Sequence, residues 1–276
     1  MHATPRKVDL ALFLPSLIGG GAERVMVSLA NTFAARGHGI DLVLASATGP
    51  YIDDVAPAVR IVDLKSSRVL TSIPKLAGYI REAKPASILS GIYHANLAAI
   101  LARQISGRRE RLIISEHNSL EPLSSSRTGA IALYLMRRLY PRADGISAVS
   151  AGVAEDLQSY LGLPKENVRV VYNPVVTSQL LARAKEPLHH EWAKPEAPPI
   201  ILGVGRLSRQ KNFEMLVRCF AGIADTTNAR LVILGEGELR PALEDQIRTL
   251  ASWYAEASPA LIGMGNGMER NQNGGN

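Results

Sequence analysis

Hydrophobic and polar positions follow a regular rhythm along this chain, in which short apolar runs alternate with longer amphipathic stretches. Val8 to Leu14 and Ile40 to Ala45 are apolar almost throughout, which predicts strands that are covered on both faces of a sheet. Between them, Glu23 to Arg36 carries apolar residues at helical spacing, and Gly37-His38-Gly39 ends the pattern. These elements form one βαβ unit, for which a right-handed crossover is expected.

The same rhythm continues to about residue 174. Further strands are expected at Val59 to Leu64, Ser87 to Leu89, Leu112 to Ser115, Ile146 to Val149 and Val168 to Tyr172. Helices are expected at Ile73 to Ala83 after Ser72, at Ala95 to Gln104, at Ala130 to Leu139 and in a segment capped by Ser150. This alternation predicts an α/β fold with a mostly parallel sheet and helices on both faces.

Composition divides the chain into an N-terminal domain over 1–183, a linker over 184–199 that is rich in proline and charge, and a second domain. The second domain covers 200–250, with strands at Ile200 to Val204 and Arg230 to Leu234 and helices at Phe213 to Ala224 and Leu239 to Leu250. These elements are too few to cover a parallel sheet on both faces, so the domain is expected to be partial. Residues 251–276 are expected to form a disordered or aberrant tail. Such a tail is either natural or the product of a truncation or frameshift near Thr249 to Trp253.

Composition also limits the kinds of partner. Apolar residues make up 46% of the 276 residues, without a run long enough to span a bilayer, which predicts a soluble globular protein. The net charge of +6 suits anionic partners such as phosphorylated small molecules or an anionic membrane surface. Aromatic residues are scarce and not interleaved with basic ones, so nucleic acid is not an expected partner. Cys219 is the sole cysteine, which favours a reducing, cytoplasmic compartment.

Two loops after strands carry residue types that bind anions. Gly19-Gly20-Gly21 stands between the first strand and the first helix, where backbone N–H groups at a helix start can approach a phosphate. After Ile200 to Val204, Gly205, Arg206 and Lys211 precede another helix. A tight structural turn and a basic surface loop explain the two patterns equally well, so both interpretations stay open. The glycine spacing is not that of a dinucleotide-binding loop, which disfavours a nicotinamide-dependent oxidoreductase.

An ordered set of landmarks resembles family-4 retaining glycosyltransferases of the GT-B fold. The landmarks are Pro15 to Arg24 with Arg36-Gly37-His38, Ile114 to Asn118, Ile146 to Ser150, Val171 to Pro174, Gly203 to Leu207 with Lys211-Asn212, and Ile233 to Gly237. They occur in family order over about residues 8 to 250. The resemblance implies a GT-B-like pair of Rossmann-like domains, of which the N-terminal one is complete and the C-terminal one partial.

The resemblance also implies roles for particular residues. The donor diphosphate would be bound by Gly20, Gly21, Arg206 and Lys211, the sugar or reacting centre by His117 as the catalytic candidate, and acceptor hydroxyls by Glu116 and Asn118. Enzymes of this fold usually need no divalent metal, and the sequence has no Asp-x-Asp triplet or clustered His/Cys set, so no metal or other cofactor is expected. His189-His190 is interpreted as a solvated pair, and His94 as structural.

The implied reaction moves a sugar from a nucleotide-diphosphate-sugar to a glycan or lipid-linked acceptor, with retention, in cell-surface polysaccharide or glycoconjugate synthesis. The protein would be cytoplasmic and peripheral at the inner face of the membrane. The family's donor-binding segment with two glutamates has no counterpart after Leu250, so weak or absent activity is expected. The alternatives are a non-catalytic truncated remnant that folds and binds acceptor or membrane, and the disfavoured oxidoreductase.

Overall fold

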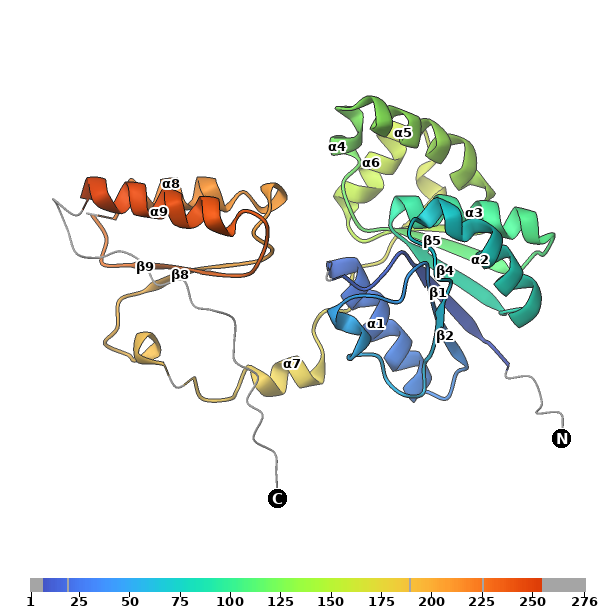
Figure 1. Cartoon of the computed structure of the whole chain (residues 1–276), viewed down its shortest axis with the longest axis horizontal. Coiled ribbons are helices and arrows are strands. Elements are labelled where there is room, and N and C mark those ends of the chain that lie inside the picture. The colour runs from blue at the N-terminus through green and yellow to red at the C-terminus, as the bar shows by residue number, and fades with distance from the viewer. Residues whose placement is uncertain (1–6, 19, 189, 225, 255–276) are drawn as a thin grey trace, which may run out of the picture. The chain divides into compact units, whose positions relative to one another are not determined.

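The computed structural model describes residues 7–18, 20–188, 190–224 and 226–254. The chain divides into two compact units, Met1–Leu181 and Ala182–Asn276 (Figure 1). The domain and linker boundaries expected from the sequence stay predictions. Of the expected tail, residues 251–254 belong to the last helix, and the remainder lies outside the described residues, as does His189.

The first unit is built on a seven-stranded sheet whose neighbouring strands all pair in parallel. The strands are β1 (Leu10–Leu14), β2 (Ile40–Leu44), β3 (Arg60–Asp63), β4 (Ser87–Gly91), β5 (Arg111–Glu116), β6 (Gly145–Ala148) and β7 (Val168–Val170). Their order is β3-β2-β1-β4-β5-β6-β7, so the winding reverses between β1 and β4. This arrangement confirms the predicted α/β fold, and ligands of doubly wound sheets bind at the carboxyl ends of strands near such a reversal.

Helices cover the two faces of this sheet unequally. One face carries α1 (Gly21–Ala35), and the other carries α2 (Val69–Ala83), α3 (Tyr93–Ser106), α5 (Arg127–Leu139) and α6 (Ala151–Leu161) (Figure 1). Successive residues of β1 point to opposite faces, because Leu12 and Leu14 pack in the cluster with α1 whereas Phe13 packs in the larger cluster on the other side. The prediction of helices on both faces is therefore confirmed for β1 and β2.

Helix α2 begins earlier than the sequence predicts. Ser72 was expected to precede the helix, but α2 starts at Val69 and includes both Ser72 and Pro74. The carbonyl that loses its partner at Pro74 belongs to Leu70, which is exposed, so water can satisfy it. The hydroxyl of Ser72 donates to the carbonyl of Val69 at 2.6 Å instead of capping the helix.

Other local predictions agree more closely with the structure. The Ser150 hydroxyl accepts from the Val153 N–H at 3.3 Å, which confirms the predicted cap of α6. Two short helices, α4 (Glu121–Ser124) and α7 (Ser178–Arg183), were not expected. None of the helices in the described ranges has the length and apolar character needed to cross a membrane.

The second unit contains a parallel pair of strands, β8 (Ile200–Val204) and β9 (Arg230–Leu234), with helices α8 (Phe213–Ala221) and α9 (Arg240–Tyr254). Its core cluster includes Phe213, Val217, Leu231 and Leu243. Apolar side chains of β8 remain exposed within the described residues, including Leu202 at 56% and Val204 at 68%. Parallel strands are normally covered on both faces, so this unit has the incomplete cover that the sequence predicts.

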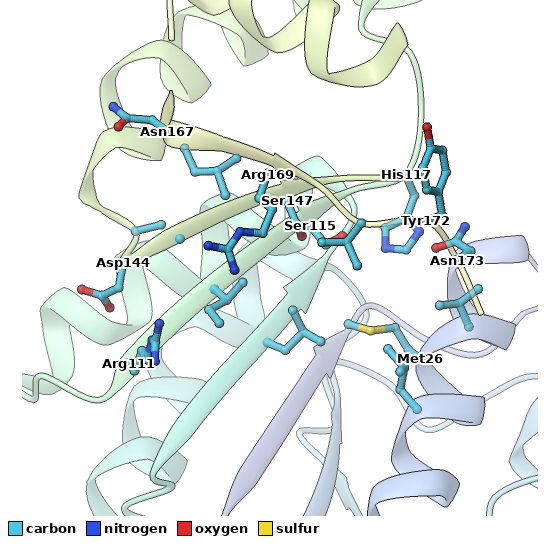
Figure 2. Close-up of a pocket in the computed structure, with 18 of the residues that line it drawn as sticks. Met26, Arg111, Ser115, His117, Asp144, Ser147, Asn167, Arg169, Tyr172 and Asn173 are labelled. Atoms are coloured by element: carbon cyan, nitrogen blue, oxygen red, sulfur yellow. The ribbon is translucent and has the colours of Figure 1, made fainter. Parts of the chain in front are cut away.

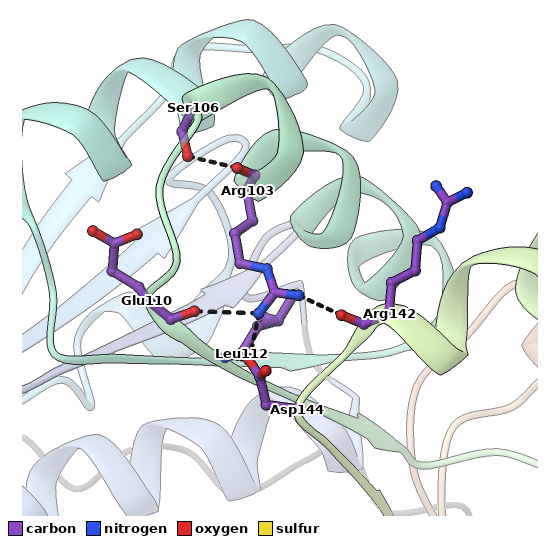
Figure 3. A network of polar contacts seen from close by, with 6 residues as sticks. All are labelled: Arg103, Ser106, Glu110, Leu112, Arg142 and Asp144. Atoms are coloured by element: carbon purple, nitrogen blue, oxygen red, sulfur yellow. Dashed lines mark hydrogen bonds and ion pairs between the residues drawn. The ribbon is translucent and has the colours of Figure 1, made fainter.

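Arg103 joins three elements at the amino ends of the strands (Figure 3). Its guanidinium donates to the carbonyl of Glu110 at 3.2 Å, to the carbonyl of Arg142 and to the carboxylate of Asp144. The Leu112 N–H donates to the same carboxylate at 2.7 Å. Burial raises the pKa of Asp144, but the Leu112 N–H and the Arg103 charge outweigh burial and hold this pKa below its usual value.

Replacing Arg103 with methionine is expected to lower the free energy of unfolding by about 2 kcal/mol, because the carbonyls of Glu110 and Arg142 lose their donor. Urea denaturation measures this change. Arg81→Met is the matched control, since Arg81 is exposed on α2, and it should change the free energy by less than about 0.5 kcal/mol. Equal effects of the two substitutions would contradict the role given to Arg103.

Candidate functional site

The turn after β1 presents the positive end of α1 at the carboxyl edge of the sheet. Gly20 is the residue before the helix and Gly21 is its first residue, while Gly19 lies outside the described residues. A Cβ added to Gly21 would meet nothing within 4 Å, so the turn is open on that side. First-turn N–H groups of a helix have no acceptor within the helix and attract anions. The open turn therefore suits the predicted diphosphate contact.

The carboxylate of Glu23 occupies the space over the start of α1. A Cβ on Gly20 would lie 2.1 Å from the Glu23 Oε2 atom, which places that carboxylate over the turn. An acidic side chain in the first turn is stabilised by the helix dipole. A bound diphosphate would have to displace this carboxylate, and the flexible glutamate side chain allows such a movement.

His117 directly follows β5, and its ring lies against the end of β4 and against α1 (Figure 2). A Cβ on Gly91 would be 3.4 Å from Nε2 of His117 and 3.2 Å from Cε of Met26. Both ring nitrogens are buried and have no hydrogen-bond partner among the described residues. Burial lowers the pKa of His117 to about 4, so the imidazole is neutral near pH 7. Buried polar atoms are rarely left without a partner, and these two nitrogens are suited to meet a ligand.

Backbone strain accompanies His117 in the neighbouring turn. Ile92 has φ +77° and ψ 132°, a region that β-branched residues rarely adopt. Its N–H donates to the carbonyl of Ser115 at 3.2 Å, and its carbonyl accepts from the N–H of Asn96 at 2.9 Å. Such strain costs on the order of 1–3 kcal/mol and concentrates at functional sites. Here the strained turn places the start of α3 beside the end of β5.

Glu116 lies on the opposite side of β5 from His117 and is almost fully buried. Its carboxylate accepts from the side-chain amide of Asn96 at 2.8 Å and from the hydroxyl of Tyr140, in the 3-10 turn Tyr140–Arg142. Burial raises the pKa of Glu116 to about 7, although both hydrogen bonds act in the other direction.

This placement corrects the expectation that Glu116 touches acceptor hydroxyls. Successive side chains of a strand point to opposite faces, so the residue before His117 faces the helix-covered side and has no open side toward an acceptor. Asn118 is exposed at the same strand end, and its acceptor contact stays a prediction.

The sheet face opposite α3 and α5 bounds a cavity of about 830 Å³ (Figure 2). Its floor includes Leu89, Ile113 and Ser147, its wall includes Met26, and His117 lies at its carboxyl end. Parallel sheets are normally covered on both faces. The cavity is therefore best interpreted as a stretch of sheet that the described residues leave uncovered, and the strand ends rather than this face define the candidate site.

In the second unit, the loop after β8 carries both predicted cations. Arg206 and Lys211 are exposed, and the alkyl chain of Lys211 passes 3.5 Å from the place of a Cβ on Gly205. Helix α8 begins two residues after Lys211, so its positive end lies next to the same loop. A Cβ on Gly235 would be 1.8 Å from the Gly205 carbonyl oxygen, because the loops after β8 and β9 run side by side. The loop after β8 therefore combines two cations and a helix start.

The structure brings the predicted residues together in two groups. Gly20, Gly21, His117 and Asn118 share the carboxyl edge of the first sheet, and Arg206 and Lys211 share the loop after β8. Their roles stay predictions. The sequence pattern did not single out Asn96 or Tyr140, although a polar residue within the apolar stretch Ala95 to Leu101 was a signal for Asn96.

Two further histidines lie outside these two groups. His94 is half-buried and packs edge-on against Tyr93 at 5.0 Å, and burial lowers its pKa. His190 accepts from the Trp192 N–H at 3.1 Å. Within the described ranges, no three His, Cys, Asp or Glu side chains gather as a metal site. The expected independence from metal stays a prediction.

A doubly wound parallel sheet with an open helix start, followed by a second α/β unit with a basic strand-end loop, defines a two-unit α/β protein with a candidate anion-binding turn in each unit. Residues 19–179 match the model of Glycosyltransferase Family 4, and residues 184–252 match that of Glycosyl transferases group 1. The first match covers more than half of the chain, which therefore belongs to glycosyltransferase family 4 and is a glycosyltransferase by descent.

Two curated relatives come from Campylobacter jejuni. One is N-acetylgalactosamine-N,N'-diacetylbacillosaminyl-diphospho-undecaprenol 4-alpha-N-acetylgalactosaminyltransferase, which is 28% identical over 93% of this chain and 70% of the relative. The other is GalNAc-alpha-(1->4)-GalNAc-alpha-(1->3)-diNAcBac-PP-undecaprenol alpha-1,4-N-acetyl-D-galactosaminyltransferase, which is 25% identical over 88% of this chain and 66% of the relative. The chain thus spans about two thirds of the length of each.

Among solved structures, Anabaena Alr3699/HepE in complex with UDP-glucose superposes with a TM-score of 0.65 at 17% identity, covering 88% of this chain and 66% of that one. At this identity the likeness shows the fold alone. It supports the GT-B-like architecture that the sequence predicts.

Proposed function

We propose that this protein transfers a sugar from a nucleotide-diphosphate-sugar to a lipid-linked acceptor, with retention, in glycoconjugate synthesis at an anionic membrane surface. Family membership supports the transferase class. The names of both Campylobacter relatives include an undecaprenol-linked diphosphate, which supports the acceptor class, and the HepE complex supports a nucleotide-sugar donor.

The observation that carries this proposal is the basic loop after β8. Negative charge grows on the leaving nucleotide diphosphate as the bond to the sugar breaks. Arg206 and Lys211, next to the start of α8, are exposed cations that can act on that charge. Groups that act where charge develops lower the barrier more than they aid ground-state binding. These cations would supply the positive charge that other transferases take from a divalent metal.

His117 would act on the sugar side of the same reaction. A sugar that loses its diphosphate acquires positive, oxocarbenium-like character. Because burial lowers the pKa of His117 to about 4, the ring would be neutral and would not repel this charge. One ring nitrogen could donate a hydrogen bond to a sugar hydroxyl, which would satisfy an atom that is buried without a partner.

The exposed apolar face of β8 favours one alternative, a non-catalytic protein that folds and binds acceptor or membrane. A transfer assay with labelled nucleotide sugars and lipid-linked acceptors, run beside calorimetry with UDP, distinguishes these functions. If the assays detect neither transfer nor nucleotide binding, only the non-catalytic alternative remains.

Replacing Lys211 with alanine is expected to weaken UDP binding about 10- to 100-fold, since a hydrogen bond to a charged group contributes about 1.5–3 kcal/mol. Isothermal titration calorimetry with UDP measures this change. Lys185→Ala is the control, because Lys185 is exposed outside the loop and should leave the affinity unchanged. An affinity for UDP that does not respond to Lys211→Ala would place the diphosphate elsewhere.

A further inference from the structure

Helix α5 has an apolar face that points away from the core. Gly129, Met136 and Leu139 face inward and are buried, as the amphipathic pattern requires. On the outer side, however, Ile131 is 61% exposed and Tyr134 is 58% exposed, with Leu135 beside them at 40%. Single exposed apolar residues are common on protein surfaces, whereas three neighbouring ones on one helix face form an apolar patch of the kind found at interaction sites.

Arginines stand at both ends of this face. Arg127, Ile131, Tyr134 and Arg138 follow one another at spacings of four, three and four residues, which places them in one stripe along the helix. The guanidinium of Arg138 lies 5.5 Å from the centre of the Tyr134 ring. We name this stripe, together with Leu135, the α5 outer face. Figure 1 shows α5 in the helix layer that covers the sheet on the side away from α1.

Helix α5 itself carries charge of one sign only. Residues 127–139 contain three arginines and no acidic residue, and Glu121 in α4 is the nearest acid before them in the chain. Arg137 does not belong to the α5 outer face, because its guanidinium donates to the carbonyl of Tyr160 at 2.8 Å. Tyr160 lies in α6, which packs against α5. The face is thus an apolar and aromatic centre between two cations.

We propose that the α5 outer face docks onto anionic lipid headgroups at a bilayer surface. Apolar and aromatic side chains enter the boundary between headgroups and acyl chains, while arginines pair with lipid phosphates beside them. A tyrosine suits this boundary because its ring is apolar and its hydroxyl remains in water. This inference rests on the proposed function in one respect, namely that a lipid-linked acceptor lies in such a surface.

Co-sedimentation of the full chain with vesicles tests the proposal. The wild-type protein is expected to bind vesicles of phosphatidylcholine mixed with phosphatidylglycerol and not vesicles of phosphatidylcholine alone. Arg127→Gln and Arg138→Gln should each weaken binding about fivefold, the effect of one basic residue at an anionic surface. The double substitution Ile131→Ser with Tyr134→Ser should weaken it at least as much. Raising the salt concentration should weaken vesicle binding by the wild type. It should also reduce the difference in vesicle binding between the wild type and the arginine variants.

Matched control variants come from α2, where Leu70 is 70% exposed and Arg81 is exposed. Leu70→Ser and Arg81→Gln should leave vesicle binding unchanged, and circular dichroism melts should show that every variant folds. Equal binding to neutral vesicles, no binding at all, or equal losses in the α2 controls would each overturn the proposal. A change in self-association of the α5 variants without a change in vesicle binding would overturn it in favour of a contact between copies.

The vesicle assay contains neither nucleotide sugar nor acceptor, so its result is separate from that of the transfer assay. Vesicle binding through α5 without transfer contradicts the proposed function alone. Transfer to a short-chain, water-soluble acceptor without vesicle binding contradicts the α5 proposal alone.

Discussion

Replacing His117 with alanine is expected to lower the kcat of sugar transfer about 10²- to 10³-fold while leaving the affinity for UDP within about twofold. The expected loss in rate is that of a preorganised hydrogen-bonding group that acts on the reacting centre. The affinity for UDP should survive because the diphosphate contacts are predicted in the turn before α1 and the loop after β8, and not at His117. Single-turnover transfer of labelled sugar measures the rate, and calorimetry measures the affinity.

His38→Ala is the matched control, since His38 lies after the end of α1 and packs edge-on against Phe33 at 6.0 Å. It should leave kcat unchanged. The pH profile adds an independent check, because the active ring is neutral and the pKa of His117 is lowered to about 4. The transfer rate of the wild type should therefore not fall between about pH 8 and pH 5.5 through protonation of His117. The pH profiles of the wild type and of His117→Ala should have the same shape over this range. A histidine-dependent loss near pH 6.5 would show that the ring titrates as an exposed histidine does.

The free energy of unfolding of the wild-type protein is expected to contain a contribution from Glu116 that decreases as the pH rises from about 4.5 to about 7. Glu116→Gln is expected to abolish this contribution. The pKa of Glu116 is raised to about 7 in the folded protein because burial disfavours the charged carboxylate. Between the two pH values the unfolded chain releases this proton and the folded chain retains it. The free energy of unfolding therefore decreases with pH, by about 3 kcal/mol in total, at about 1.36 kcal/mol per pH unit.

Urea denaturation of the wild type and of Glu116→Gln at several pH values measures this difference. Below about pH 3.5 and above about pH 8 the difference in free energy of unfolding between the two proteins should be constant, because Glu116 then has the same charge in the folded and unfolded states. Glu155→Gln is the control for the loss of a carboxyl group as such, since Glu155 is exposed on α6. A difference that stays constant with pH for Glu116→Gln would mean that Glu116 is ionised in the folded protein at pH 5.

Local elements of this fold were predictable because they depend on short patterns. The bounds of β8 and β9 agree with the prediction to the residue, since each is a short apolar run that follows polar or proline-rich sequence. The start of α2 was not predictable in the same way, because Pro74 normally marks a helix start and only the exposure of Leu70 makes its interior position tolerable. Glycine-rich and basic loops were also visible, because their residue types are unusual wherever they occur.

By itself the sequence determined the alternation of strands and helices, the parallel α/β class, the glycosyltransferase family and the loops that carry Gly20, Gly21, His117, Arg206 and Lys211. Each follows from neighbouring residues or from an ordered set of short motifs. Only the tertiary structure decided the direction of Glu116 and the burial of both His117 nitrogens. The physical reason is that these properties depend on packing between distant segments, with Asn96 and Tyr140 around Glu116 and Met26 and Gly91 around His117. The direction of a side chain on a strand depends on which face the helices cover, and that is a property of the folded sheet.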